Sequence, residues 1–104
     1  MKEAVKKQVD EIVTALNGGK DAEDFTEAAQ KDPYVFIMEA GGKMLVHPTL
    51  AGQSLKEKAE PVYQEVAKGT PNGVWVKYEW QGVAKSTYSR KTQSGLIVGS
   101  GYNE

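Results

Sequence analysis

The stretch YVFIMEAGGKMLVHPTL, Tyr34–Leu50, predicts a β-hairpin and decides the fold class. Its first part, Tyr34–Met38, is an unbroken apolar run rich in the β-branched and aromatic residues that strands favour. Glu39–Lys43 contains two adjacent glycines and has the composition of a tight reversal. Met44–Val46 then returns as a second strand, which ends before Pro48 because proline has no N–H to donate to a sheet.

Two helices are expected ahead of this hairpin. Near the N-terminus, apolar residues recur at helical spacing, namely Val5, Val9, Ile12, Val13 and Leu16. Gly18-Gly19 acts as a stop signal, so the first helix is predicted to span Lys2–Leu16. Asp21 can cap a second helix, DAEDFTEAAQK, which must end before Pro33. The apolar stripe of the first helix needs a sheet or a partner to cover it, so one expectation is a homodimer through this helix.

The second half of the chain predicts a turn, a helix and three strands. A turn around Leu55–Ala59 precedes a helix over Glu60–Lys68, because its proline is acceptable in a first helical turn. Val74–Trp80 alternates with a period of two residues and is followed by a two-residue turn. Val83–Arg90 is the return strand, and a last strand begins at Leu96.

These elements predict an α+β fold in which a five-stranded antiparallel sheet carries helices on one face. A chain of 104 residues forms one domain, and 39% hydrophobic with 26% charged residues is typical of a globular protein. The net charge of −1, from 13 basic and 14 acidic residues, gives no basic face for nucleic acid. The chain contains no cysteine, which excludes thiolate catalysis, cysteine-ligated zinc and disulfides.

The sequence shows no nucleophile elbow and no spacing typical of metal ligands, so we expect neither an enzyme nor a bound cofactor. No stretch reaches the roughly 18 apolar residues that a membrane span needs, and no signal-peptide pattern opens the chain. The chain is therefore expected to be a soluble protein or a domain of a longer protein.

Three segments in order resemble the Cache family, in its single-Cache form. They are the hairpin with its terminal His47-Pro48, the LAGQSL segment that follows, and GLIVGSGY at Gly95–Tyr102. The resemblance covers roughly Asp32–Tyr102 and implies a PAS-like fold, in which the long N-terminal helix and further helices pack on the sheet. It implies one domain over 1–104, with helices in 1–31 and the sheet and ligand pocket in 32–104.

The family consists of extracytoplasmic sensor domains of bacterial chemoreceptors, histidine kinases and some free-standing binding proteins. The resemblance thus implies a periplasmic or extracellular domain that binds a small molecule, either a short-chain carboxylate or an amino acid. Binding would be relayed to an attached signalling module, and membrane contact would come only through flanking segments. Two alternatives stay open: a ligand-free structural or dimerisation module, and a free-standing periplasmic binding protein.

His47 is the one histidine, and it has two interpretations. As a ligand-binding residue it would donate to, or form an ion pair with, an anionic ligand. As a structural residue its ring would bond a backbone carbonyl in the following loop.

Aromatic residues in the last third of the chain suggest a small-ligand pocket, although core packing is the alternative. The residues predicted to bind the ligand are Phe36, Met38, His47, Trp75, Tyr78, Lys85, Ser86 and Tyr88. Tyr78 and Tyr88 are expected to line the pocket, with Ser86 on the face of Tyr88. Lys85 or Arg90 would neutralise a carboxylate.

Overall fold

The computed structural model describes residues 2–104. Two helices open the chain, and a second pair of helices separates the first two strands from the last three. In chain order they are α1 (Lys2–Asn17), the 3₁₀ helix η1 (Ala22–Gln30), β1 (Val35–Met38), β2 (Met44–Val46), α2 (Leu55–Lys58), α3 (Glu60–Val66), β3 (Val74–Trp80), β4 (Val83–Lys91) and β5 (Ile97–Asn103). No helix in residues 2–104 combines the length and the apolar character that a membrane crossing requires.

The five strands form one antiparallel sheet in the order β2-β1-β5-β4-β3, which confirms the predicted α+β class. The C-terminal strand β5 therefore lies at the centre. It pairs with β1 from Val35↔Ser100 to Met38↔Ile97, and with β4 from Lys85↔Asn103 to Lys91↔Ile97. The edges are the short β2 and the longer β3.

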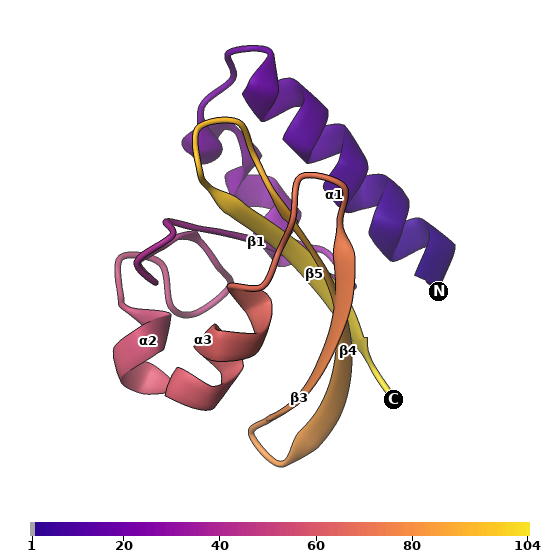
Figure 1. Cartoon of the computed structure of the whole chain (residues 1–104), viewed down its shortest axis with the longest axis vertical. Helices are drawn as coiled ribbons and strands as arrows, with labels where there is room; N and C mark the ends of the chain where they lie inside the picture. Colours follow the sequence, from indigo (N-terminus) through magenta and orange to yellow (C-terminus); the bar gives the residue numbers. More distant parts are fainter. Residues whose placement is uncertain (1) are drawn as a thin grey trace.

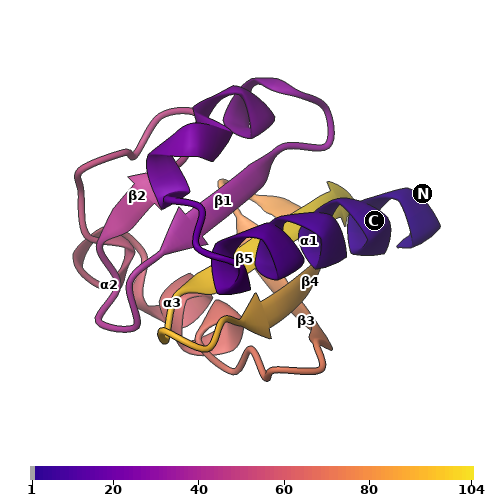
Figure 2. The same cartoon turned by 90° about the horizontal axis from the view of Figure 1, so that it is seen from above.

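Helices cover both faces of the sheet, so the prediction of helices on one face is wrong. Figure 1 shows α1 on one side of the strands and α2 with α3 on the other, and Figure 2 shows α1 lying along β5 and β4. The reason is visible in β1, whose four residues are all buried. An unbroken apolar run, rather than an alternating one, is what a strand with two covered faces requires.

The apolar stripe of α1 packs on the chain's own sheet. Val5, Val9 and Val13 are at most 1% exposed, and they share a core with Val35 and Ile37 of β1. Burial of such side chains stabilises the fold by roughly 1.5–3 kcal/mol each. Because its own sheet already covers this stripe, the stripe gives no reason to expect a partner, and dimerisation through α1 stays a prediction.

The second core lies under α2 and α3. Phe36, Met38 and Met44 project from the first hairpin, and they meet apolar side chains from both helices, namely Leu55, Val62 and Val66. Successive residues of β1 thus alternate between the two cores, with Ile37 on the α1 side and Phe36 on the α3 side. This second core contains the cavity described below.

Two predicted helices differ in detail from the structure. The second one is a 3₁₀ helix, interrupted where Phe25 has φ −110° and ψ 20°, outside the helical region. Leu55–Lys58, predicted as a turn, is a single helical turn because the Ser54 hydroxyl accepts a hydrogen bond from the Glu57 amide at 3.3 Å. The third helix ends at Val66, two residues earlier than predicted.

Side chains of β4 hold the connection between α3 and β3 through its backbone carbonyls. The Ser89 hydroxyl donates to the Val66 carbonyl at 2.7 Å, at the end of α3. Arg90 Nε donates to the Pro71 carbonyl at 2.8 Å, and its Nη1 donates to Asp10 Oδ1 of α1 at 2.9 Å. Arg90 therefore joins this connection to α1.

The Asp10 carboxylate accepts hydrogen bonds from two cations. Burial raises its pKa, but hydrogen bonds from Lys6 and Arg90 outweigh that effect, so the pKa lies below the usual value. Asp10 therefore stays ionised at neutral pH, and the bridge from α1 to Arg90 stays charged.

Replacing Gly99 with alanine is expected to destabilise the protein. A Cβ at this position of β5 would overlap with the Phe36 ring. Overpacking of this kind costs about 1–3 kcal/mol, and each kcal/mol lowers the melting temperature by about 4–8 °C in a domain of this size. Gly41→Ala is the control, since a Cβ there meets nothing within 4 Å. Thermal unfolding of both variants checks this, and equal melting temperatures would contradict the close packing.

Candidate functional site

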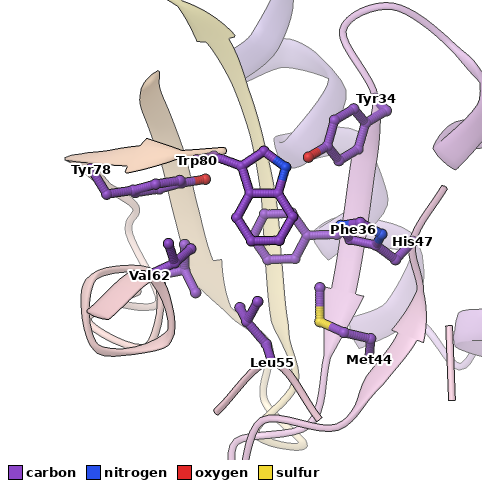
Figure 3. Close-up of a pocket in the computed structure, with 9 residues that line it drawn as sticks. Tyr34, Phe36, Met44, His47, Leu55, Val62, Tyr78 and Trp80 are labelled. Carbon is purple, nitrogen blue, oxygen red and sulfur yellow. The ribbon is translucent and has the colours of Figure 1, made fainter. Parts of the chain in front are cut away.

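A small cavity lies between the sheet and the α2–α3 pair. Three aromatic side chains and one imidazole supply its polar atoms, and the other lining residues are apolar. The lining residues are Tyr34, Phe36, Met44, His47, Leu55, Val62, Val66, Tyr78 and Trp80. Figure 3 shows the hydroxyl groups of Tyr34 and Tyr78 pointing toward the Trp80 indole, with Phe36 behind it.

Strand alternation brings these side chains to one face. Tyr34 and Phe36 are two residues apart at β1, and Tyr78 and Trp80 are two residues apart on β3. His47 follows the last residue of β2, where the chain leaves the sheet. The T-shaped contacts of the His47 ring, with centroids 5.5 Å from Tyr34 and 6.3 Å from Trp80, join the two sides of the cavity.

The cavity is almost filled by its own side chains. Its volume is about 10 Å³, near the smallest space that holds one water molecule. Anything larger can enter only if a lining side chain moves. Trp80 is the candidate to move, because it lies at the end of β3 beside the Gln81-Gly82 turn and is only half-buried.

The His47 ring organises the loop after β2 as a hydrogen-bond acceptor. Its Nδ1 accepts hydrogen bonds from the backbone amides of Thr49 and Leu50, both at 3.0 Å. Two N–H groups directed at Nδ1 require that this nitrogen carries no proton, so the neutral ring carries its proton on Nε2. The predicted structural role is therefore wrong in one respect: the ring accepts from backbone amides instead of bonding a carbonyl.

The environment of His47 keeps its imidazole neutral. Burial lowers its pKa from 6.5 to about 4, and the nearby positive charge of Lys85 acts in the same direction. The two amide donors add to this effect, because a proton on Nδ1 would face them. At neutral pH His47 can therefore donate a hydrogen bond through Nε2–H, but it does not supply a cation for an ion pair.

Tyr78 is held in place by a hydrogen bond across the hairpin. Its hydroxyl lies 2.8 Å from the Thr87 hydroxyl. Burial raises the pKa of Tyr78 to about 12, and burial also raises the pKa of Tyr34. Both phenols are therefore uncharged over the physiological range and act only as hydrogen-bonding groups.

Lys85 lies outside the cavity, in a hollow that adjoins it. Its ammonium is 4.7 Å from the centroid of the Tyr34 ring, a cation–π contact. The hollow has a volume of about 570 Å³ and is lined by Asp32, Pro33, Tyr34, Lys85, Gly101, Tyr102 and Asn103. Tyr34 thus forms a wall of both spaces.

Five of the predicted ligand-binding residues lie on the α3 side of the sheet. Phe36, His47 and Tyr78 line the cavity, and Met38 belongs to the same core without lining it. Lys85 lies on the same face, next to the cavity. Whether these residues bind a ligand stays a prediction.

Three predicted residues, Trp75, Ser86 and Tyr88, lie on the α1 face instead. Trp75 pairs with Tyr88 across the strands, and their rings are 5.2 Å apart. The pocket that combined Tyr78 with Tyr88 and Ser86 is therefore not formed. The reason is the strand register set by the two-residue turn, which places Tyr78 opposite Lys85 and puts Tyr88 on the other face.

Several lining residues were not among those predicted. Trp80 and Tyr34 could have been found from strand alternation, because they lie two residues from Tyr78 and from Phe36. Met44 reaches the cavity from β2 of the first hairpin. The other three, Leu55, Val62 and Val66, reach it through the packing of α2 and α3, for which the sequence has no local signal. Arg90, considered for a carboxylate, bonds Pro71 and Asp10.

A metal ion finds no ready site in the part of the chain that the structure describes. No three or more histidine and acidic side chains gather there closely enough to hold one.

Comparison with known proteins supports the fold. No protein-family model matches the chain, and no curated protein matches it in sequence. Among solved structures, the chain is similar to the ligand-binding domain of Mlp24 with asparagine, with a TM-score of 0.54 and 13% sequence identity. The match covers 81% of this chain and 35% of that chain, so this chain spans about a third of the length of the structure it matches.

At 13% identity, this likeness shows the fold alone. The N-terminal helix, the five-stranded antiparallel sheet and the helices between β2 and β3 form a PAS-like α+β fold, consistent with the fold of the matched structure.

Protonation of His47 is expected to destabilise the protein as the pH falls. The folded pKa of about 4 lies below the ordinary 6.5, so the unfolded chain takes up the proton first. The contribution of His47 to the free energy of unfolding is therefore complete above pH 6.5 and is lost as the pH falls toward 4. Chemical unfolding at a series of pH values measures this effect.

The variant His47→Asn serves as the control, because an amide oxygen can accept the same backbone N–H bonds and does not titrate. Carboxyl groups titrate in both proteins and cancel in the comparison. Parallel pH profiles for the two proteins would show that the ring is not held neutral.

Proposed function

We propose that the chain is a ligand-sensing domain that binds a small molecule between its sheet and α2–α3. The observation that carries this proposal is the cavity, where Tyr34, His47 and Trp80 bring polar atoms to an otherwise apolar space. An apolar lining with a few directed hydrogen-bonding groups is typical of small-ligand sites. The similarity to the ligand-binding domain of Mlp24 supports this proposal.

The ligand class we propose is a short-chain carboxylate or an amino acid. The cavity itself contains no formal charge at neutral pH, because His47 is neutral and the phenols are protonated. Lys85 next to the cavity supplies a cation for a carboxylate. The solved domain of Mlp24 contains asparagine, which has this chemistry.

Ligand binding would be relayed to α1. A ligand shifts a conformational equilibrium only through its different affinity for the two states. Opening the cavity moves the elements that close it, and Arg90 joins the α3–β3 connection to Asp10 of α1. We propose that α1 passes this change to an attached signalling module. The proposed location is extracytoplasmic, either periplasmic or extracellular, with flanking segments providing any membrane contact.

A ligand-free structural or dimerisation module is the second candidate. The observation that favours it is the volume of the cavity, which at about 10 Å³ resembles an ordinary packed core. A free-standing periplasmic binding protein would share the site and lack the relay. Ligand binding separates the first candidate from a purely structural module.

A thermal-shift screen against short organic acids and amino acids, including asparagine, tests the proposal. A ligand present at 100 times its dissociation constant should raise the free energy of unfolding by about 2.7 kcal/mol. That corresponds to about 4–8 °C for each kcal/mol. Absence of any shift across the panel would favour the structural module.

The two tryptophans report where a ligand binds, since they lie on opposite faces. The Trp75→Phe variant keeps Trp80 at the cavity, and the Trp80→Phe variant keeps Trp75 under α1. A ligand that enters the cavity is expected to displace or contact the Trp80 indole, which lines it. Its fluorescence is expected to change in the Trp75→Phe variant and to stay constant in the Trp80→Phe variant. The reverse pattern would place the ligand on the α1 face.

Arg90 is expected to couple the ligand site to α1. With a ligand from the screen, amide hydrogen exchange in α1 should change in the parent protein, and this change should be lost in Arg90→Gln. Ligand affinity should stay within about twofold, because Arg90 does not line the cavity. Lys91→Gln is the control, since Lys91 is the exposed neighbour on the same strand. An unchanged response in Arg90→Gln would exclude this route.

A further inference from the structure

The hollow beside the cavity forms where β1 begins. The first residue of β1, Val35, pairs with Ser100, whereas β5 continues alongside β4 to Asn103. The last part of β5 therefore has no strand partner on its β1 side. The segment Asp32–Tyr34 and Lys85 of β4 border the resulting space of about 570 Å³. A volume of this size lies in the range of small-molecule sites, which the filled cavity does not.

Two opposite charges face this hollow without meeting. Lys85 is half-buried, and Asp32 is an exposed residue of the segment that leads into β1; both line the hollow. Within residues 2–104, neither side chain forms an ion pair. Burial lowers the pKa of Lys85, and the nearby Asp32 carboxylate opposes that effect because it favours the charged ammonium.

We propose that this hollow binds the charged end of a small zwitterion, with the carboxylate at Lys85 and the ammonium at Asp32. Such a ligand carries its two charges a few ångströms apart, so it can form an ion pair with Lys85 and another with Asp32 at the same time. A simple carboxylate would leave Asp32 unpaired beside a like charge, and a simple amine would do the same at Lys85. The site would therefore select a zwitterion over a simple carboxylate or amine, both because two ion pairs form and because neither protein charge is left unpaired.

Tyr34 connects this hollow to the cavity, and in this respect the inference rests on the proposed function. The Lys85 ammonium lies over the Tyr34 ring, and that ring makes a T-shaped contact with His47. A carboxylate that draws Lys85 toward itself weakens the cation–π contact that helps to hold Tyr34. A ligand in the hollow would thus affect Tyr34, which also lines the cavity, although no ligand atom enters the cavity.

Amide NMR titrations with three matched compounds test the hollow. Alanine has both charges, propionate lacks the ammonium and ethylamine lacks the carboxylate. Alanine is expected to shift the amide resonances of Asp32, Tyr34 and Gly101–Asn103, and the two analogues are expected to bind at least about tenfold more weakly. The pattern of shifted resonances locates the site on the full chain.

Two variants with matched controls assign the charges. Lys85→Met is expected to weaken the binding of alanine by about tenfold or more. Asp32→Asn is expected to weaken the binding of alanine but not the binding of propionate. Lys77→Met and Glu79→Gln change the same charges at exposed positions on β3, outside the hollow, and should leave binding unchanged. The dispersion of each amide spectrum verifies that the variant is folded.

The outcomes separate this inference from the proposed function. Equal binding of alanine and propionate, or no effect of Asp32→Asn, overturns the zwitterion site. Amide shifts confined to His47, Trp80 and their neighbours would contradict binding in the hollow but would leave the ligand-sensing proposal standing. The absence of amide shifts with all three compounds would also contradict binding in the hollow. The broader thermal-shift panel then tests the proposed function separately.

Discussion

The pairing of β5 between β1 and β4 is the interaction on which both cores depend. Val98 of this strand belongs to the core under α1, and its neighbour Ile97 belongs to the core under α3. Gly99 lets the Phe36 ring lie directly against the backbone, and the Ser100 hydroxyl donates to the Tyr34 carbonyl at 2.7 Å. The central strand comes last in the chain, so neither core closes until the C-terminus has paired with strands that precede it by many residues. Long-range pairing of this kind carries a large loop-closure cost, which the buried surface on both faces must offset.

The candidate site follows from this two-faced arrangement. One face of the sheet is fully used by the long helix, whereas the other is covered by two short helices that leave a small cavity among aromatic side chains. The His47 ring holds the loop at its margin by accepting hydrogen bonds from two backbone amides. It stays neutral chiefly because burial lowers its pKa, with the positive charge of Lys85 acting in the same direction. The charged groups lie outside, where water and a ligand can reach them. The desolvation cost of a buried charge accounts for this separation between an uncharged cavity and a charged hollow.

Most of the secondary structure was predictable from local signals. Met44–Val46 and Val74–Trp80 have the predicted bounds, because proline and a two-residue glycine turn stop them sharply. The pocket was predicted less well, because aromatic character alone does not assign a side chain to a face. The register of the second hairpin did contain that information: the turn at Gln81-Gly82 places Lys85, and not Tyr88, opposite Tyr78. The coverage of both faces by helices was likewise indicated by the unbroken apolar run of β1, whose four residues are all buried.

The sequence by itself determined the five strands, the first helix and the helix that follows Ala59, since these depend on periodicity and turn residues within a few positions of one another. It did not determine the 3₁₀ form of η1 or the helical turn at Leu55–Lys58. It also determined that one histidine would lie at a strand end beside a loop. Only the tertiary structure decided the strand order, which side chains share the cavity and which charges share the hollow. These depend on contacts between segments far apart in the chain, such as Tyr34 with Lys85 and Asp10 with Arg90. No local pattern encodes such contacts, because their free energy exists only after the sheet has closed around β5.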